Sequence, residues 1–141
     1  MKSPTAAVAK NSFLIGLKFK TMLGVDIVEN DRIRRSLDRF GERFLNRIYT
    51  EGEREYCFSQ KDPIPCLAAR WAAKEAVIKA FFQTFGVVLK FKRIEVKGKR
   101  GLPAEVLILG QEAELLRESG KRIVISLAHE RHYSVAVAQI V

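Results

Sequence analysis

Residues 70–80 read RWAAKEAVIKA, and this run predicts the long helix around which the rest of the fold is built. Alanine and the long unbranched side chains are the strongest helix formers. Apolar residues at helical spacing extend the pattern on both sides and form one stripe: Leu67, Trp71, Ile78 and Phe82. Glu75 falls inside that stripe, at a position where the pattern calls for an apolar residue.

A carboxylate at the position of Glu75 needs a partner. Burying an unpaired carboxylate costs several kcal/mol, about 3–5 when a buried pair is broken. Lys79 lies one turn further on, but an exposed pair at that spacing contributes only about 0.2–0.5 kcal/mol. The position therefore favours a metal ion or a polar cleft. Taken alone, the helix is equally compatible with a partly exposed glutamate at the edge of the stripe.

A second carboxylate occupies an unusual place near the start of the chain. Residues 23–29 read LGVDIVE, and their β-branched character predicts a strand. Strand alternation puts Leu23, Val25 and Ile27 on one face and Gly24, Asp26 and Val28 on the other. An acidic residue within such a run is disfavoured, and Gly24 leaves space beside Asp26 for a ligand or another backbone. A solvent-facing aspartate on an edge strand is the alternative.

Asp26 and Glu75 together indicate a divalent cation. Mg²⁺ is usually held by one or two carboxylates, several waters and substrate phosphates. Basic residues flank both positions, as a phosphorylated substrate would require. The two carboxylates together therefore favour a magnesium site more than either does alone.

Three segments resemble the holo-acyl carrier protein synthases, which are 4′-phosphopantetheinyl transferases. The run GVDIVENDRI at 24–33 is similar to the family opening G-[IV]-D-[IL]-x-E-x-x-R-[IV]. AARWAAKEA at 68–76 resembles the more specific segment [RG]-[FW]-A-A-K-E-A. SLAH at 126–129 is similar to the strand end S-[IL]-[ST]-H, and all three occur in the family's order across 22–141.

The resemblance implies a fold and a reaction. The fold is α+β, with helices packed on a largely antiparallel sheet and one long central helix. The protomers form a homotrimer that binds coenzyme A at the subunit interfaces. A serine hydroxyl of an apo-acyl carrier protein attacks the β-phosphorus of coenzyme A, phosphopantetheine is transferred, and 3′,5′-adenosine bisphosphate leaves.

The resemblance also implies the site residues. Asp26 and Glu75 hold Mg²⁺, Lys79 supplies charge to the phosphates, and Glu75 is the candidate base, acting directly or through a metal-bound water. The substrate-binding candidates are Arg32, for the acidic carrier protein, with Arg70, Lys74 and His129 for coenzyme A. Alternatives stay open for Arg70, as a structural ion-pair partner, and for Lys74, as a surface residue. The stretch FFQTFG at 81–86 departs from the family's short Gly-rich continuation, so no coenzyme contacts are assigned there.

Composition is compatible with this reading. A chain of 141 residues with 48% hydrophobic and 29% charged residues is typical of one globular domain. No apolar run approaches the roughly 18–20 residues that span a bilayer. The two cysteines, Cys57 and Cys66, fit no metal spacing, so we expect free thiols and a cytoplasmic protein.

The first 21 residues are expected to lie outside the fold. They contain four lysines and no acid, and Met22 stands where the family's chains usually start. Residues 1–21 are interpreted as an upstream-start extension or an artificial leader, with a transit peptide as the alternative. Residues 22–141 form the single transferase domain. Its net charge of +5, against +9 for the whole chain, suits an anionic partner.

The remaining pattern predicts helices first and strands later. A helix capped by Asn30 or Asp31 is interrupted at Gly41, and Thr50 with Glu53 forms a capping box for another. Later segments predict four strands, at 91–96, 104–109, 123–128 and 133–140, and a short helix at 111–119. This order of elements is typical of an α+β fold. His132 receives no role, and a metal site formed by His129 and His132 is rejected for want of further ligands.

Six arginines line the exposed side of the first helices: Arg32, Arg34, Arg35, Arg39, Arg43 and Arg47. They fit an acidic protein partner, although such a face is also compatible with a merely solvated surface. A small basic nucleic-acid-binding module is the main rival function, but the strands lack the aromatic cluster that stacks bases. A degenerate relative that binds without turnover is the second rival. We expect neither a nucleic-acid nor a membrane partner.

Overall fold

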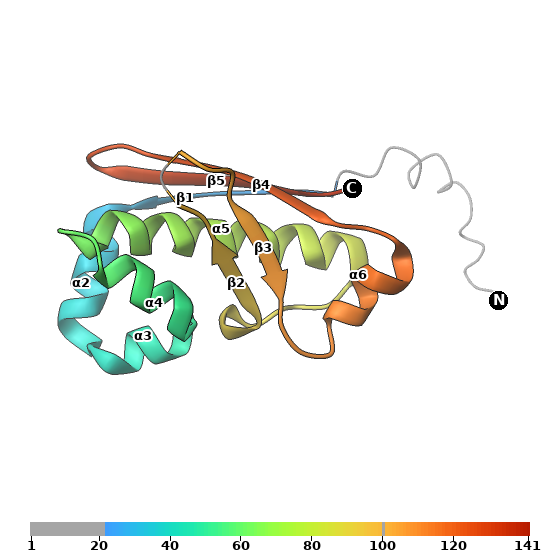
Figure 1. Ribbon diagram of the computed structural model, residues 1–141, viewed down its shortest axis with the longest axis horizontal. Helices are drawn as coiled ribbons and strands as arrows, with labels where there is room; N and C mark the ends of the chain where they lie inside the picture. The colour runs from blue at the N-terminus through green and yellow to red at the C-terminus, as the bar shows by residue number, and fades with distance from the viewer. Residues whose placement is uncertain (1–21, 100) are drawn as a thin grey trace.

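The computed structural model describes residues 22–99 and 101–141 (Figure 1), so the predicted leader lies outside the described residues. The elements follow one another as β1 (Leu23–Glu29), α2 (Asn30–Phe40), α3 (Glu42–Ile48), α4 (Glu51–Phe58), α5 (Pro63–Phe85), a 3-10 turn (Phe91–Arg93), β2 (Ile94–Lys97), β3 (Glu105–Ile108), α6 (Ala113–Ser119), β4 (Ile123–His129) and β5 (Tyr133–Ile140). The fold is α+β, as predicted.

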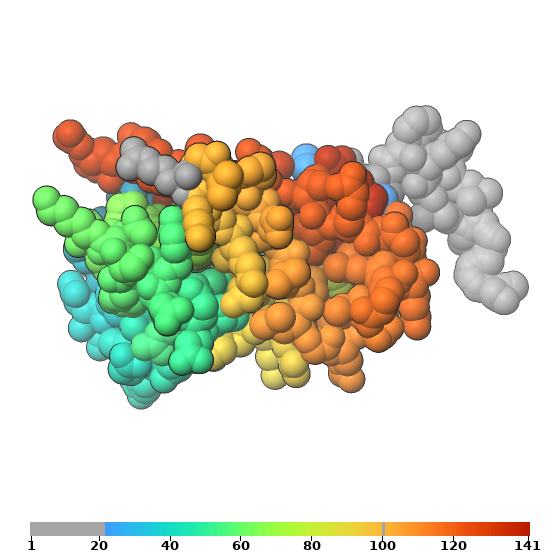
Figure 2. All heavy atoms as spheres, viewed as in Figure 1, coloured from blue at the N-terminus to red at the C-terminus, as the bar shows by residue number. Residues whose placement is uncertain are grey.

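An antiparallel three-stranded sheet lies along the long helix α5. Its strand order is β1-β5-β4, with Asp26 opposite Ala136 and Ala136 opposite Leu127. A separate antiparallel pair, β2-β3, crosses α5 on another side, and α2, α3 and α4 gather at one end of the long helix (Figure 1). On the face shown in Figure 2, α4 and the β2-β3 hairpin cover most of α5.

The buried side of α5 is largely alanine, joined by Val77, Phe81 and only one residue of the predicted stripe, Leu67. The fully buried alanines are Ala68, Ala72, Ala73, Ala76 and Ala80. Phe82 is 52% exposed, and Trp71 and Ile78 are only half-buried. The predicted core stripe was therefore wrong in part, because small side chains let the sheet approach the helix backbone closely. Glu75 lies on the half-buried side, outside the core.

Gly24 is the point of closest approach between β1 and α5. A Cβ atom added at this position would lie 1.9 Å from the carbonyl oxygen of Ala76. No side chain fits that space, so the contact requires glycine. The space predicted beside Asp26 is therefore filled by the backbone of α5, which brings the strand and the helix that hold the two carboxylates into direct contact.

The face of the sheet that points away from α5 is apolar and uncovered in the single chain. Residues of β1 on this face include Val25, 53% exposed, and Ile27, 64% exposed. Their neighbours on β5, Val137 and Tyr133, are also exposed. The predicted alternation of β1 is confirmed, and it is the more polar face, with Gly24 and Asp26, that packs against the helix. An exposed apolar face of this kind marks an interaction surface.

Local signals placed most of the other elements correctly. Gly41 separates α2 from α3 with a φ of 54°, and the Thr50–Glu53 capping box opens α4. Asn30 makes no cap; its side-chain amide donates to the carbonyl oxygens of Glu130 and Arg131 at 3.0 and 3.2 Å. The strand predicted from residue 91 begins only at Ile94, after the 3-10 turn.

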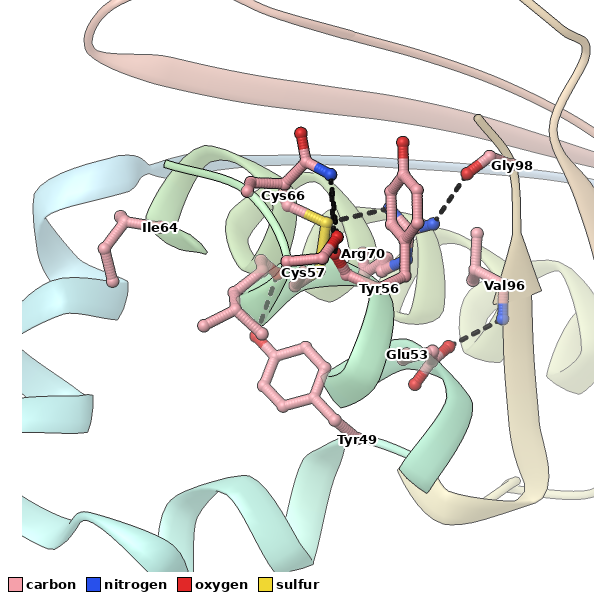
Figure 3. The surroundings of a disulfide bond; sticks show 12 residues. Tyr49, Glu53, Tyr56, Cys57, Ile64, Cys66, Arg70, Val96 and Gly98 are labelled. Carbon is pink, nitrogen blue, oxygen red and sulfur yellow. Dashed lines mark hydrogen bonds between the residues drawn. A yellow bond between two sulfur atoms is a disulfide. The ribbon is translucent and has the colours of Figure 1, made fainter. Parts of the chain in front are cut away.

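The prediction of two free thiols was wrong, because Cys57 and Cys66 form a disulfide between α4 and the first turn of α5 (Figure 3). Their Cα atoms lie 5.3 Å apart. This proximity arises from the packing of two helices, so the spacing of the cysteines along the sequence gives no sign of it. Among the described residues, no helix combines the length and apolarity needed to cross a membrane.

Candidate active site

Three of the predicted site residues meet where β1 contacts α5. Lys79 Nζ donates to Asp26 Oδ1 at 3.1 Å and to the carbonyl oxygen of Val25 at 2.9 Å. The Asp26 side chain is 16% exposed and that of Lys79 is 50% exposed. Lys79 therefore pairs with Asp26 rather than with Glu75. The Asp26 carboxylate is therefore mostly covered, two residues from the contact that Gly24 makes possible.

Glu75 belongs to the same cluster. Partial burial raises the pKa of Glu75, and the negative charge of Asp26 raises it further. The positive charges of Lys79 and Arg32 oppose this rise. Glu75, the neighbouring carboxylate of Asp26, and the nearby charges of Lys79 and Arg32 form one electrostatic unit, although they are distant in sequence.

The residues of this cluster fit a divalent cation. Like charges held together disfavour ionisation, and a cation between them would remove that cost. Asp26 and Glu75 both offer carboxylate oxygens, which are the ligands that Mg²⁺ prefers. Proteins commonly hold Mg²⁺ with one or two carboxylates. Within 22–99 and 101–141 no group of three or more potential ligands occurs. Waters and substrate oxygens would have to complete the coordination.

A cavity of about 420 Å³ lies on another side of α5 and contains two further predicted residues, Arg70 and His129. Its walls come from the end of α4, the start of α5, the loop of the β2-β3 hairpin and the end of β4. Tyr56, Cys66 and Gly98 lie beside Arg70 in this wall. The structure thus brings together two side chains that are 59 positions apart in the sequence.

Arg70 is a buried cation without a carboxylate partner in the described part of the chain. Its residue is 6% exposed, and burial lowers its pKa. Nη2 donates to the carbonyl oxygen of Gly98 at 3.1 Å, Nη1 contacts Cys66 Sγ at 3.3 Å, and Nε has no partner (Figure 3). The structure therefore gives no support to Arg70 as an ion-pair partner. A buried cation of this kind favours an anionic ligand.

The carboxylate cluster and the cavity lie on different flanks of α5. Asp26 is on β1 and His129 is at the end of β4, and these strands are the two edges of the sheet, with β5 between them. The side chains of Asp26 and His129 both lie on the face of the sheet that packs against α5. Each is paired with a buried residue of β5, Asp26 with Ala136 and His129 with Ser134, and paired residues share a face. The helix therefore separates the two groups within one chain.

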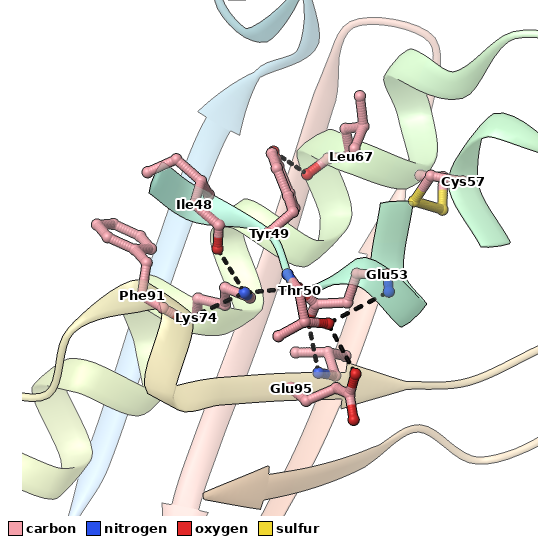
Figure 4. Close-up of polar contacts among 11 residues, drawn as sticks. Ile48, Tyr49, Thr50, Glu53, Cys57, Leu67, Lys74, Phe91 and Glu95 are labelled. Atoms are coloured by element: carbon pink, nitrogen blue, oxygen red, sulfur yellow. Dashed lines mark hydrogen bonds and ion pairs between the residues drawn. A yellow bond between two sulfur atoms is a disulfide. The ribbon is translucent and has the colours of Figure 1, made fainter. Parts of the chain in front are cut away.

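Lys74 does not lie in either group (Figure 4). Its side chain is fully buried, and Nζ pairs with Glu53 Oε1 at 2.6 Å and donates to the carbonyl oxygens of Ile48 and Phe91. Glu53 Oε2 also accepts from the backbone N–H of Val96 at 2.6 Å. The predicted substrate contact by Lys74 is therefore wrong, as is its alternative at the surface. This lysine joins α5 to α3, α4 and the 3-10 turn inside the protein.

Comparison with known proteins identifies the family. Residues 22–138 match the family model of the 4′-phosphopantetheinyl transferase superfamily. The chain belongs to this superfamily. A holo-[acyl-carrier-protein] synthase of Aquifex aeolicus is 54% identical over 119 residues, which are 84% of this chain and 97% of that protein. One from Chlamydia trachomatis is 48% identical over 116 residues, which are 82% and 95%.

Solved structures agree with this phosphopantetheinyl transferase assignment. The holo-[acyl-carrier-protein] synthase of Neisseria meningitidis matches with a TM-score of 0.74 and 28% identity, covering 86% of this chain and 98% of that one. An ACPS–CoA complex of Chronobacterium ammoniagenes matches with a TM-score of 0.71 and 30% identity, covering 84% and 94%. The predicted family, fold and enzyme class, a holo-acyl carrier protein synthase, are confirmed.

The transferase has a basic face on α2 and α3. Arg34 pairs with Asp62 and Arg35 with Asp31, so these two are partly neutralised. Arg39 and Arg43 flank the exposed ring of Phe40, at 5.2 and 5.9 Å from its centroid, and have no ion pair in the described residues. This face offers an apolar ring with two guanidinium groups close to it.

Sequence reasoning missed three residues of the cavity wall. Arg70 lies over the ring of Tyr56 with its Cζ 4.9 Å from the centroid, and Gly98 and Cys66 accept from its guanidinium. Tyr56 and Cys66 are unremarkable in sequence, since one is an aromatic residue on a short helix and the other a cysteine without a metal spacing. The glycine of a hairpin loop, Gly98, gave the only signal of a close approach.

Proposed function

We propose that the protein transfers 4′-phosphopantetheine from coenzyme A to a serine of an acidic apo-acyl carrier protein and releases 3′,5′-adenosine bisphosphate, with Mg²⁺ as cofactor. The proposal rests on one observation above the others: Asp26, Glu75 and Lys79 converge at the contact of β1 with α5. The superfamily match and the names of the relatives support the same reaction.

The cluster suits phosphoryl transfer because this chemistry depends on positioning and on neutralising charge. Mg²⁺ held by Asp26 and Glu75 would supply Lewis-acid charge to the diphosphate of coenzyme A. Lys79, half exposed and bonded to Asp26, can move its ammonium group from that carboxylate to a substrate phosphate oxygen. The positive charge of Lys79 thus neutralises the Asp26 carboxylate before the substrate binds and the substrate phosphate afterwards.

Glu75 is the proposed acceptor of the serine proton. The serine oxygen forms a bond to the β-phosphorus, the bond from that phosphorus to the bridging oxygen breaks, and 3′,5′-adenosine bisphosphate leaves with the electron pair. Partial burial raises the pKa of Glu75 in the metal-free protein, which favours a basic carboxylate, while Mg²⁺ would offset the added effect of the Asp26 charge. The proton moves from the serine hydroxyl to a carboxylate oxygen of Glu75.

The cavity with Arg70 and His129 would hold the nucleotide end of coenzyme A. Its size, about 420 Å³, is within the range of small-molecule sites. Arg70 is a buried cation with no directly paired carboxylate among the described residues, although the charge of Glu53 acts on it, and a coenzyme phosphate would supply a direct partner. His129 at the end of β4 would complete this phosphate site.

The separation of the two groups supports a homotrimer with sites at the subunit interfaces. One coenzyme A molecule must contact both a carboxylate cluster and a nucleotide cavity. Within one subunit, however, α5 lies between the cluster and the cavity. In an assembly, the cluster of one subunit can face the cavity of the next. The exposed apolar sheet face that includes Val25, Ile27 and Val137 would be buried by this association.

The arginines of α2 and α3 would bind the carrier protein. Arg32 contributes to the electrostatics of Glu75, so a partner bound at this face would present its serine next to the carboxylate cluster. Arg39 and Arg43 with Phe40 extend the surface along the helix. We place the reaction in the supply of carrier protein for fatty acid biosynthesis and in the cytoplasm, a compartment in which the Cys57–Cys66 disulfide would be exposed to reductants. A nucleic-acid-binding role leaves the paired carboxylates without a purpose.

The test is an incubation with apo-acyl carrier protein, coenzyme A and Mg²⁺, followed by mass spectrometry of the carrier protein. We expect the mass gain of one phosphopantetheine on wild-type enzyme and none with Glu75→Gln. Glu118→Gln, at an exposed glutamate of α6, is the matched control and should retain activity. No mass gain on several carrier proteins would refute the proposed reaction, and wild-type turnover by Glu75→Gln would remove Glu75 from it.

A further inference from the structure

The disulfide lies directly beside the buried guanidinium group of the cavity. Cys66 is one turn before Arg70 on α5, and its sulfur contacts Arg70 Nη1 at 3.3 Å (Figure 3). Cys57 is fully buried at the end of α4 and holds the other sulfur. Cys66 also lines the cavity. The bond is therefore part of the wall in which the proposed phosphate-binding arginine sits.

Three different elements fix the orientation of Arg70. The sulfur of Cys66 comes from α5, the carbonyl oxygen of Gly98 follows β2, and the ring of Tyr56 comes from α4. Tyr56 is the immediate neighbour of Cys57, so the bond that joins α4 to α5 also holds the ring beneath the guanidinium group. Two of the three contacts therefore depend on the disulfide.

We propose that the Cys57–Cys66 disulfide positions Arg70, so that the affinity of the cavity for the anionic nucleotide end of coenzyme A depends on the redox state of this bond. The inference rests on the proposed function. While bonded, the Cys66 sulfur has a fixed direction and can only accept a hydrogen bond. A free thiol rotates among staggered rotamers and is itself a weak donor, so it no longer defines one position for Nη1.

Reduction by a dithiol gives a balanced reaction. The dithiol supplies two electrons and two protons, the S–S bond breaks, two S–H bonds form, and the reductant closes to its own cyclic disulfide. Mass spectrometry after thiol alkylation would count two new alkyl groups on the reduced protein and none on the oxidised one. Alkylation of both cysteines in protein that was air-oxidised without reductant would overturn the inference, because the bond would then be absent.

Steady-state kinetics of the oxidised and reduced enzyme test the positioning role. With saturating apo-acyl carrier protein, we expect reduction to raise KM for coenzyme A by about three- to tenfold, the range of one ordinary intramolecular hydrogen bond. We expect kcat to stay unchanged, because contacts with the nucleotide end are equal in ground and transition states. Cys57→Ser/Cys66→Ser should show the KM of the reduced enzyme whether or not reductant is present.

Arg70→Lys separates positioning from a purely structural role. This variant keeps the charge but lacks the fork that contacts Cys66 and Gly98, so its KM should be high and independent of redox state. A disulfide that only stabilises the fold would lower Tm on reduction and leave the same redox effect on KM in Arg70→Lys. That result, or an equal KM for both forms of the wild type, would overturn the inference.

Direct binding distinguishes failure of this inference from failure of the proposed function. Calorimetry with 3′,5′-adenosine bisphosphate should give a Kd about three- to tenfold weaker for the reduced wild type, for the same reason as KM. Equal binding by both forms would refute the redox effect alone, and it needs no variant that must fold. Absence of binding and of transfer in both forms would refute the proposed function, and with it this inference.

Discussion

Replacing Gly24 by alanine should be unusually costly for a single methyl group. The new Cβ would lie 1.9 Å from the Ala76 carbonyl oxygen, 2.9 Å from its carbon and 3.0 Å from the Ala80 nitrogen. All three are backbone atoms of α5, so no side chain can rotate away. Moving from 1.9 Å to the 3.0 Å limit of real Cβ contacts requires β1 and α5 to separate by about 1 Å. Overpacking of this kind costs about 1–3 kcal/mol or more.

The same displacement would move Asp26 away from Glu75, so transfer activity should fall further than the fraction of folded protein. Urea unfolding at one fixed protein concentration gives the stability change, and the carrier-protein assay gives the rate. Gly52→Ala on α4 is the control, since its Cβ would meet only the movable carboxylate of Glu95, at 2.9 Å. Wild-type stability and activity in Gly24→Ala would refute the close contact of β1 with α5.

Three further predictions follow from other parts of the structure. Lys74→Met should destabilise the protein by about 3–5 kcal/mol in urea unfolding, because Glu53 is left buried without its cation. In a carboxyl NMR titration of metal-free protein, Glu75 should lose its proton at a higher pH than an ordinary glutamate, and Asp26→Asn should lower this pKa by removing the like charge. An unchanged pKa in the variant would refute the coupling. Ile27→Glu should convert a trimer to monomers in sedimentation, and an unaltered oligomer would exclude this sheet face from the interface.

The sequence allowed the elements of the fold to be predicted where one local rule decides the outcome. The strand at 133–140 and the capping box at Thr50 follow from alternation and from side-chain hydrogen bonding, and both are confirmed. The buried face of α5 was misplaced because hydrophobic periodicity favours large side chains. Here close sheet packing selects alanine, and Phe82 remains exposed. At Ala76 and Ala80 the contact of Gly24 with α5 accounts for that choice.

The candidate site was predictable as a set of anomalies but not as a geometry. Asp26 and Glu75 were noticed because each carboxylate stood where an apolar residue was expected. The role assigned to Lys74 failed because its partner, Glu53, lies 21 positions earlier in the chain and faces it only in the folded protein. The disulfide escaped prediction for a similar reason, since the turn between α4 and α5 determines whether the two cysteines meet.

The central claim, that the carboxylates of Asp26 and Glu75 bind one divalent cation together, is tested most directly by metal titration. Mn²⁺ can replace Mg²⁺ as a probe, with the free ion followed by electron paramagnetic resonance in the presence of coenzyme A and without carrier protein. We expect Asp26→Asn and Glu75→Gln each to weaken binding by roughly tenfold or more, since loss of even an outer-shell partner has that effect. The double variant should lose little beyond either single one, because each change already breaks the same site. Wild-type affinity in either single variant, or independent additive losses, would contradict the shared site.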